Sequence, residues 1–127
     1  MRYLVFLFTF LVGTLFGEDQ VVRRAAFDIG SGQVKLQVAD VDVKTNTIVQ
    51  KIHAETAFVP LREELTKSLN GRLSDPIQDK YVEAIKGLMD KAAAFNPEVF
   101  YAVVTEPLRM AVNGGELAAR IKKEAGV

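Results

Sequence analysis

The chain has 127 residues with 16 basic and 16 acidic side chains, one histidine and no cysteine. Its length leaves room for one domain at most, and its composition, 49% hydrophobic and 25% charged, is that of a folded rather than a disordered chain. The formal charge of zero argues against nucleic acid as the main partner, and the lack of cysteine excludes a disulfide framework or a thiolate metal site.

The first residues have the layout of a secretory signal peptide. Arg2 supplies a positive charge, residues 3–16 are almost wholly apolar, and Gly17 is a small residue at a suitable cleavage point before an acidic segment. The apolar run is shorter than the roughly 20 residues that a spanning helix needs. We therefore expect export to the periplasm or the cell exterior, with residues 1–17 removed and residues 18–127 as the mature domain. The protein would remain at a membrane only if the leader stayed uncleaved.

The next segment carries the most informative motif of the chain. An apolar run predicts a strand over residues 24–29 with Asp28 near its end, and alternating apolar residues predict a second strand over residues 34–41. Between them, Gly30 and Gly32 can adopt φ > 0 and lack a Cβ, so backbone N–H groups can come close to an anion, and Ser31 adds a hydroxyl. Asp28 could hold a hydrated Mg²⁺, which typically binds one or two carboxylates plus substrate phosphates. An ordinary glycine-rich hairpin turn is the alternative interpretation.

Further strand signals follow this loop. A polar turn leads to a third strand over residues 47–54, and residues 56–61 are extended, so the first three strands predict an antiparallel meander. Residues 62–72 are less clear, with leucines at helical spacing and a stop signal at the Asn-Gly pair that ends them. Lys35 and His53 are expected to be solvent-facing strand residues without a role in chemistry.

The second half of the chain predicts two helices around a strand. Residues 76–95 have an apolar stripe at helical spacing, with Ser74 or Asp75 as the cap. Residues 99–105 form an apolar run typical of a buried strand. Asn113 is expected to cap a last helix that ends near Gly126. The order of three strands, helix, strand and helix predicts an α/β fold with a mixed sheet and helices packed on it.

A second motif and the order of the elements carry a family resemblance. The motif is Val103-Val104-Thr105-Glu106-Pro107-Leu108-Arg109, followed by Ala111 and Asn113-Gly114. With the first loop, it resembles the exopolyphosphatase/guanosine pentaphosphate phosphatase (Ppx/GppA) family, within the sugar kinase–Hsp70–actin superfamily, over residues 23–127. The resemblance implies the first part of a ribonuclease H-like lobe, and hydrolysis of a terminal phosphoanhydride on polyphosphate or a guanosine pentaphosphate-type ligand.

The resemblance also implies roles for individual residues. Asp28 would position a divalent cation, Mg²⁺, through its water, and Gly30, Ser31 and Gly32 would line the first phosphate loop. Arg109 would contact phosphate oxygens with its planar bidentate donors, and the adjacent Glu106 would orient Arg109 or metal-bound water. The loop departs from the family pattern, because Gly32 and Gln33 replace the usual Asn and Ser/Thr and make it closer to the actin version, and Pro107 replaces an Ala.

The resemblance covers only the first part of a family member. Members continue with a strand, a segment bearing the catalytic Glu, and a second glycine-rich loop, and none of these follows here. We therefore expect an N-terminal, incomplete phosphatase domain that is inactive alone, has no assignable catalytic residue, and self-associates as a homo-oligomer through an uncovered sheet edge. A non-catalytic phosphate-binding or interaction module and an actin- or Hsp70-like ATPase lobe are the alternative functions.

Overall fold

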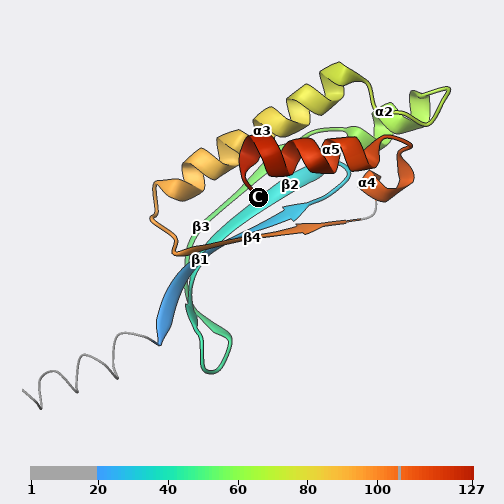
Figure 1. Ribbon diagram of the computed structural model, residues 1–127. Helices are drawn as coiled ribbons and strands as arrows, with labels where there is room; N and C mark the ends of the chain where they lie inside the picture. The colour runs from blue at the N-terminus through green and yellow to red at the C-terminus, as the bar shows by residue number, and fades with distance from the viewer. Residues whose placement is uncertain (1–19, 106) are drawn as a thin grey trace, which may run out of the picture.

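A computed structural model describes residues 20–105 and 107–127. Four strands form one mixed sheet in the order β3-β2-β1-β4, with the helices packed on it (Figure 1). β1 and β2 pair antiparallel, β2 and β3 pair antiparallel, and β4 pairs parallel with β1. The strand bounds are β1 (Val21–Ile29), β2 (Gln33–Asp42), β3 (Thr47–Phe58) and β4 (Val99–Val104). The predicted meander and the α/β class are confirmed, whereas the expected signal peptide lies outside the described residues.

The helices follow the strands in the predicted order, with two additions. Their bounds are α2 (Leu61–Lys67), α3 (Asp75–Ala93), α4 (Pro107–Met110) and α5 (Gly114–Arg120), and α5 continues into a π-helical turn, η1 (Ile121–Ala125). Ser74 caps α3, because its Oγ accepts from the backbone N–H of Ile77 at 3.5 Å. Gly126 ends the last helix in the left-handed region with φ 73°, as its position predicted. The short α4 was not predicted, and α2 occupies the start of the segment that the sequence left unclear.

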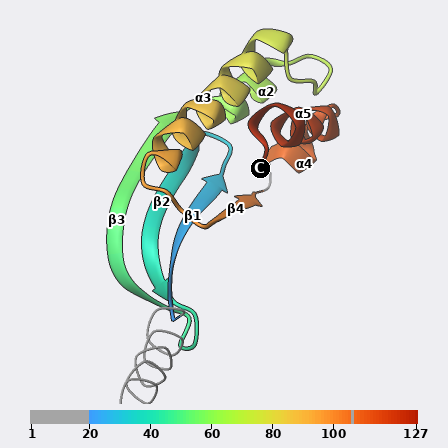
Figure 2. The same ribbon diagram turned by 60° about the vertical axis from the view of Figure 1, so that its left-hand side comes forward.

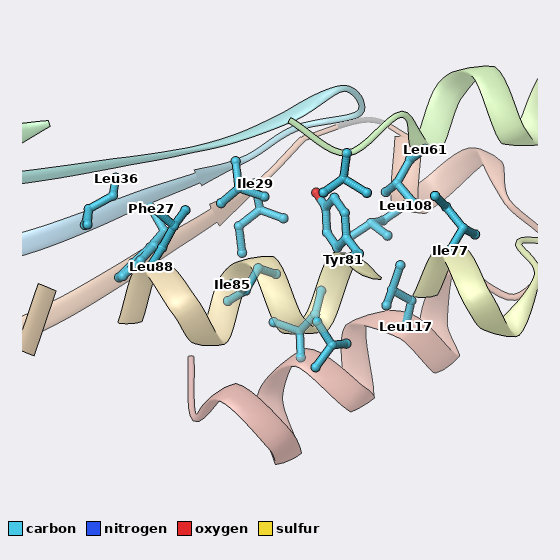
Figure 3. Close-up of a cluster of buried hydrophobic side chains, with 14 of the residues drawn as sticks. Phe27, Ile29, Leu36, Leu61, Ile77, Tyr81, Ile85, Leu88, Leu108 and Leu117 are labelled. Carbon is cyan, nitrogen blue, oxygen red and sulfur yellow. The ribbon is translucent and has the colours of Figure 1, made fainter. Parts of the chain in front are cut away.

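Alternation along β1 and β2 decides which face of the sheet is buried. Phe27 of β1 lies opposite Leu36 of β2, and both side chains point to the helices. The apolar residues two positions away on each strand are buried on the same face. Tyr81, Ile85 and Leu88 of α3 cover them (Figure 3). Burying each such side chain contributes about 1.5–3 kcal/mol. This layer between the sheet and the helices is the core of the protein.

The opposite face of the sheet has no helix on it in the described part of the chain. In Figure 2 the helices α3, α4 and α5 all lie on one side of the curved sheet. Asp28, Lys35 and Val103 belong to the helix-free face and are exposed. Because no described helix covers this face, apolar residues on it such as Val103, which is 63% exposed, are left in contact with solvent.

Two sequence predictions about burial and capping are wrong. β4 was expected to be a buried strand, but five of its six residues are exposed, since it lies at the sheet edge and pairs only with β1. Asn113 stands at the cap position of α5, yet its side chain makes no cap hydrogen bond. Its Oδ1 accepts from the backbone N–H of Leu73 at 2.8 Å and its Nδ2 donates to the Leu73 carbonyl at 2.9 Å. Because Asn113 is buried, its amide is satisfied by joining two distant loops rather than by capping its own helix.

In residues 20–105 and 107–127, none of the helices combines the length and the apolar character that crossing a bilayer requires.

Candidate phosphate-binding site

The glycine-rich loop between β1 and β2 borders a polar hollow. Its volume is about 410 Å³, and its lining residues are Asp28, Gly30, Ser31, Gly32, Gln33 and Thr105. The loop itself is a tight turn, closed by the backbone N–H of Gly30 donating to the carbonyl of Gln33 at 2.9 Å. The structure therefore brings the four residues predicted from the first motif together with Thr105 of the second motif. We call this hollow the phosphate pocket.

The two motifs meet because β1 and β4 are parallel neighbours. Ile29 of β1 lies in register with Val104 of β4, so both strands end at the same edge of the sheet. Thr105 then binds the Ile29 carbonyl twice, through its backbone N–H at 3.0 Å and its Oγ1 at 3.2 Å. Ligands of open α/β sheets commonly bind outside the carboxyl ends of such strands.

Tyr81 holds the loop from the core side. Its hydroxyl points from α3 toward the sheet (Figure 3) and donates to the carbonyl of Gly30 at 2.5 Å. Burial raises the pKa of Tyr81, and the nearby negative charge of Asp28 raises it further. The hydroxyl thus stays protonated and acts as a permanent donor to the loop.

Only one of the two loop glycines is needed, and it is needed for space rather than for a left-handed backbone. Of the described glycines only Gly71 and Gly126 have positive φ, so neither Gly30 nor Gly32 uses the conformational freedom that the sequence suggested. A Cβ on Gly30 would lie 3.0 Å from the carbonyl oxygen of Gln33, inside the turn. A Cβ on Gly32 would meet nothing within 4 Å. Gly30 is therefore the glycine that the turn requires.

Lys35 lies closer to the site than the sequence analysis assumed. It is exposed, as expected, but it is the cross-strand partner of Asp28 on the helix-free face of the sheet. A hairpin centred on residues 30–33 pairs positions 28 and 35, so the turn prediction already contained this juxtaposition. The pocket edge thus carries one exposed carboxylate and one exposed ammonium on neighbouring strands.

Arg109, the phosphate ligand predicted from the second motif, falls outside the pocket lining. It is exposed on α4, four positions beyond Thr105. Its contact with phosphate stays a prediction. Glu106 lies outside the described residues. His53 is only 31% exposed, because its ring stacks on Phe95 with 4.8 Å between centroids.

The residues of the pocket fit a divalent cation whose coordinating atoms come mostly from water and from the phosphates of a bound ligand. Among residues 20–105 and 107–127, no group of three or more His, Cys, Asp and Glu side chains is placed to hold a metal ion. Asp28 offers one exposed carboxylate beside the hydroxyls of Ser31 and Thr105. Mg²⁺ commonly binds through one or two carboxylates, waters and substrate phosphates, and in that arrangement it would neutralise phosphate charge.

Comparison with known proteins agrees with the motifs. The model of the Ppx/GppA phosphatase family matches residues 38–127. The chain belongs to the Ppx/GppA phosphatase family. Comparison with the curated proteins found no match.

Solved structures of family members resemble most of the chain. A Ppx/GppA family member from Aquifex aeolicus is 27% identical with a TM-score of 0.72 over 84% of this chain and 33% of that one. An exopolyphosphatase from Cytophaga hutchinsonii is 23% identical with a TM-score of 0.70 over 83% of this chain and 32% of that one. An exopolyphosphatase-like protein is 21% identical with a TM-score of 0.73 over 86% and 32%. The chain therefore has the family's actin-like fold and spans about a third of the length of these structures.

Proposed function

We propose that the chain forms one wall of the phosphate-binding cleft of an exported Ppx/GppA-type phosphohydrolase. The observation that carries this proposal is the phosphate pocket, where Asp28, the glycine-rich loop and Thr105 of the second motif converge at the ends of β1 and β4. Membership of the Ppx/GppA phosphatase family supports the reaction class. Export rests on residues 2–17 alone and favours polyphosphate over a cytosolic guanosine pentaphosphate-type ligand.

The residues of the pocket have distinct tasks in this proposal. Backbone N–H groups of the loop and the Ser31 hydroxyl bind oxygens of the terminal phosphate. Asp28 holds the water shell of the cation, and Arg109 supplies a second positive charge near the phosphate. In the reaction, a water oxygen would bond to the terminal phosphorus while the bridging oxygen leaves with its electron pair. The base that takes the water's proton is not assigned to any residue of this chain.

Calorimetric titration with inorganic tripolyphosphate, with and without Mg²⁺, tests the pocket. We expect Asp28→Ala to weaken the Mg²⁺-dependent binding by about tenfold or more, because a hydrogen bond to a charged group contributes about 1.5–3 kcal/mol. Asp90→Ala removes an exposed carboxylate from α3 and should leave binding unchanged. Equal losses for the two variants, or no loss for Asp28→Ala, would show that Asp28 does not serve this site.

Export is tested separately by the mass of the native protein from its source cells. Removal of residues 1–17 gives a mature chain that begins at Glu18. An intact Met1 in a cytoplasmic fraction would contradict export and leave the phosphate pocket untouched.

A further inference from the structure

The sequence contains an asparagine followed by a glycine at two positions, and the structure places the two pairs in different environments. Asn70 and Gly71 lie in the turn between α2 and α3, where Asn70 is exposed. Asn113 and Gly114 are both buried at the start of α5. In such a pair the glycine nitrogen can react with the asparagine side-chain amide, because glycine has no Cβ to hinder the approach. The chain therefore holds an exposed and a buried copy of the same reactive sequence.

The turn requires a glycine at position 71 and leaves its nitrogen free. Gly71 has φ 69°, in the left-handed region, and a Cβ there would lie 3.3 Å from the side chain of Val112. Its carbonyl accepts from the backbone N–H of Val112 at 2.9 Å, which fixes the turn against the segment between α4 and α5. Within residues 20–105 and 107–127, the N–H of Gly71 makes no hydrogen bond. The nitrogen is thus held in an ordered turn and is available as a nucleophile.

The side-chain carbonyl of Asn70 is polarised by two donors. Its Oδ1 accepts from the Ser68 hydroxyl at 2.9 Å and from the backbone N–H of Arg72 at 3.1 Å. This oxygen gains negative charge when a nucleophile adds to Cγ, and donors aimed at it stabilise that charge. The turn therefore combines an unhindered nucleophile with an activated amide carbon.

Asn113 is protected from the same reaction. Its side chain is buried, and both ends of its amide are bound to the backbone of Leu73. The N–H of Gly114 donates to the carbonyl of Ala111 at 3.0 Å. Because the amide and the glycine nitrogen are both occupied, reaction at Asn113 requires local opening of the packed loops.

We propose that Asn70 is a site of spontaneous deamidation in the folded protein, with water as the co-reactant. The Gly71 nitrogen loses its proton to solvent base and bonds to Cγ of Asn70. The bond from Cγ to Nδ2 then breaks, and ammonia leaves with the electron pair and a proton taken from water. Water next opens the succinimide ring: cleavage of the bond from Cγ to nitrogen gives aspartate, and cleavage of the bond from the backbone carbonyl carbon to nitrogen gives isoaspartate.

The reaction changes the charge of a hollow beside the start of α3. Its volume is about 560 Å³, and its lining includes Asn70 and the cations Lys67 and Arg72. A carboxylate at position 70 adds one negative charge to a chain whose formal net charge is zero. It also stands close to Arg72, whose guanidinium lies 3.6 Å from the carboxylate of Glu116 on α5. The protein would therefore exist in two forms that differ in charge at this hollow.

Incubation of the purified protein in mildly alkaline buffer, followed by peptide mapping with mass spectrometry, tests the proposal. We expect deamidation at Asn70 to be about tenfold faster or more than at Asn113, because the buried site reacts only from a locally open state. In guanidinium chloride the two sites should react at similar rates, since each has the same neighbouring glycine. Asn70→Gln should abolish the fast reaction, because glutamine would have to close a larger ring, and should leave Asn113 slow.

The comparison of folded and unfolded protein separates the effect of the turn from that of the sequence. Equal rates at the two sites of the folded protein, or an Asn70 that does not react, would overturn the proposal. A preference for Asn70 that persists in guanidinium chloride would also overturn it, since the turn would then not be the cause. A thermal melt in the incubation buffer checks that the protein stays folded during the reaction.

Discussion

At the scale of single residues, the conformation of the phosphate loop depends on a donor that lies far away in the sequence. Tyr81 is 51 positions from Gly30, yet its hydroxyl satisfies the Gly30 carbonyl from inside the core. Tyr81→Phe would keep the ring and remove the donor. We expect the free energy of unfolding to fall by about 1 kcal/mol, because the half-buried Gly30 carbonyl would lose its partner.

Urea denaturation measures this loss, and tripolyphosphate titration of the same variant measures its effect on the loop. Tyr101→Phe is the matched control, since Tyr101 is 48% exposed on β4 and its hydroxyl makes no hydrogen bond within the described residues. Similar changes in stability for the two variants would mean that the Tyr81 hydroxyl contributes nothing specific to the loop.

Local sequence predicted four of the six residues that line the phosphate pocket, but not Gln33, Thr105 or what supports the pocket. Asp28, Gly30, Ser31 and Gly32 fall within five consecutive positions, so a strand followed by a glycine-rich turn was enough to place them together. Tyr81 belongs to the apolar stripe over residues 76–95, and this pattern alone indicates that its ring faces the core. Its hydrogen bond could not be predicted, because periodicity says which face is buried and not which polar atom that face meets.

At the scale of elements, close packing between α4 and α5 requires a glycine. A Cβ on Gly114 would lie 1.5 Å from the carbonyl oxygen of Leu108, whereas a Cβ on Gly115 would meet nothing within 4 Å. We expect Gly114→Ala to lower the free energy of unfolding by about 1–3 kcal/mol or more, because α4 must move. Gly115→Ala should leave it unchanged or raise it by up to about 1 kcal/mol through helix propensity.

Thermal or urea denaturation of the two variants checks this pair. They differ by one position in the same helix, so a general effect of adding a methyl group is controlled. A Gly114→Ala protein as stable as the Gly115→Ala protein would show that α4 and α5 can separate freely.

A second element-scale feature is the ion pair that joins β1 and β2. Arg23 and Asp40 are cross-strand partners, and the guanidinium donates to both carboxylate oxygens at 2.8 and 3.1 Å. Arg23 also donates to the Phe95 carbonyl at 3.2 Å, at the end of α3. The hydrogen bonds from Arg23 hold the pKa of Asp40 below its usual value of 3.8.

This pair predicts a pH dependence of stability. Because the folded pKa of Asp40 is the lower one, its contribution is complete well above pH 3.8 and is lost as the pH falls through the folded pKa. We expect the wild-type protein to lose more stability than Asp40→Asn between pH 5 and pH 2.5, as measured by urea denaturation at each pH. Parallel losses in the two proteins would show that the pair is not responsible.

The bounds of an element were predicted well where its apolar pattern was long. The burial of a strand was predicted poorly, because burial depends on the position of the strand in the sheet. The stripe over residues 76–95 placed α3 to within a few residues of its observed bounds. The apolar run of β4 correctly predicted a strand, but it did not predict that the strand is exposed. A buried central strand and an exposed edge strand can have the same composition, and only strand order distinguishes them.

At the scale of the whole molecule, the described chain is one layer of helices on one face of a sheet. The other face carries an apolar hollow of about 440 Å³ whose lining includes Ala39, Val41 and Tyr101. The sheet also has two edges, β3 and β4. β3 carries Lys51 and Glu55, and charged side chains on an edge oppose pairing with another chain.

β4 lacks this protection. Its residues Val99–Val104 include no charged side chain and no proline, and they have no neighbour on the outer side within the described part of the chain. We therefore predict that the purified 127-residue protein self-associates in a concentration-dependent way, as sedimentation velocity can measure. Val103 is 63% exposed and lies opposite Asp28 on β1, so Val103→Lys places a charge on the edge beside a carboxylate that accommodates it. This substitution should shift the protein toward the monomer without lowering its melting temperature, whereas Leu69→Lys, at a fully exposed loop position, should not change the association. A wild-type protein that stays monomeric at high concentration, or equal effects of the two lysine substitutions, would exclude β4 as the surface of association.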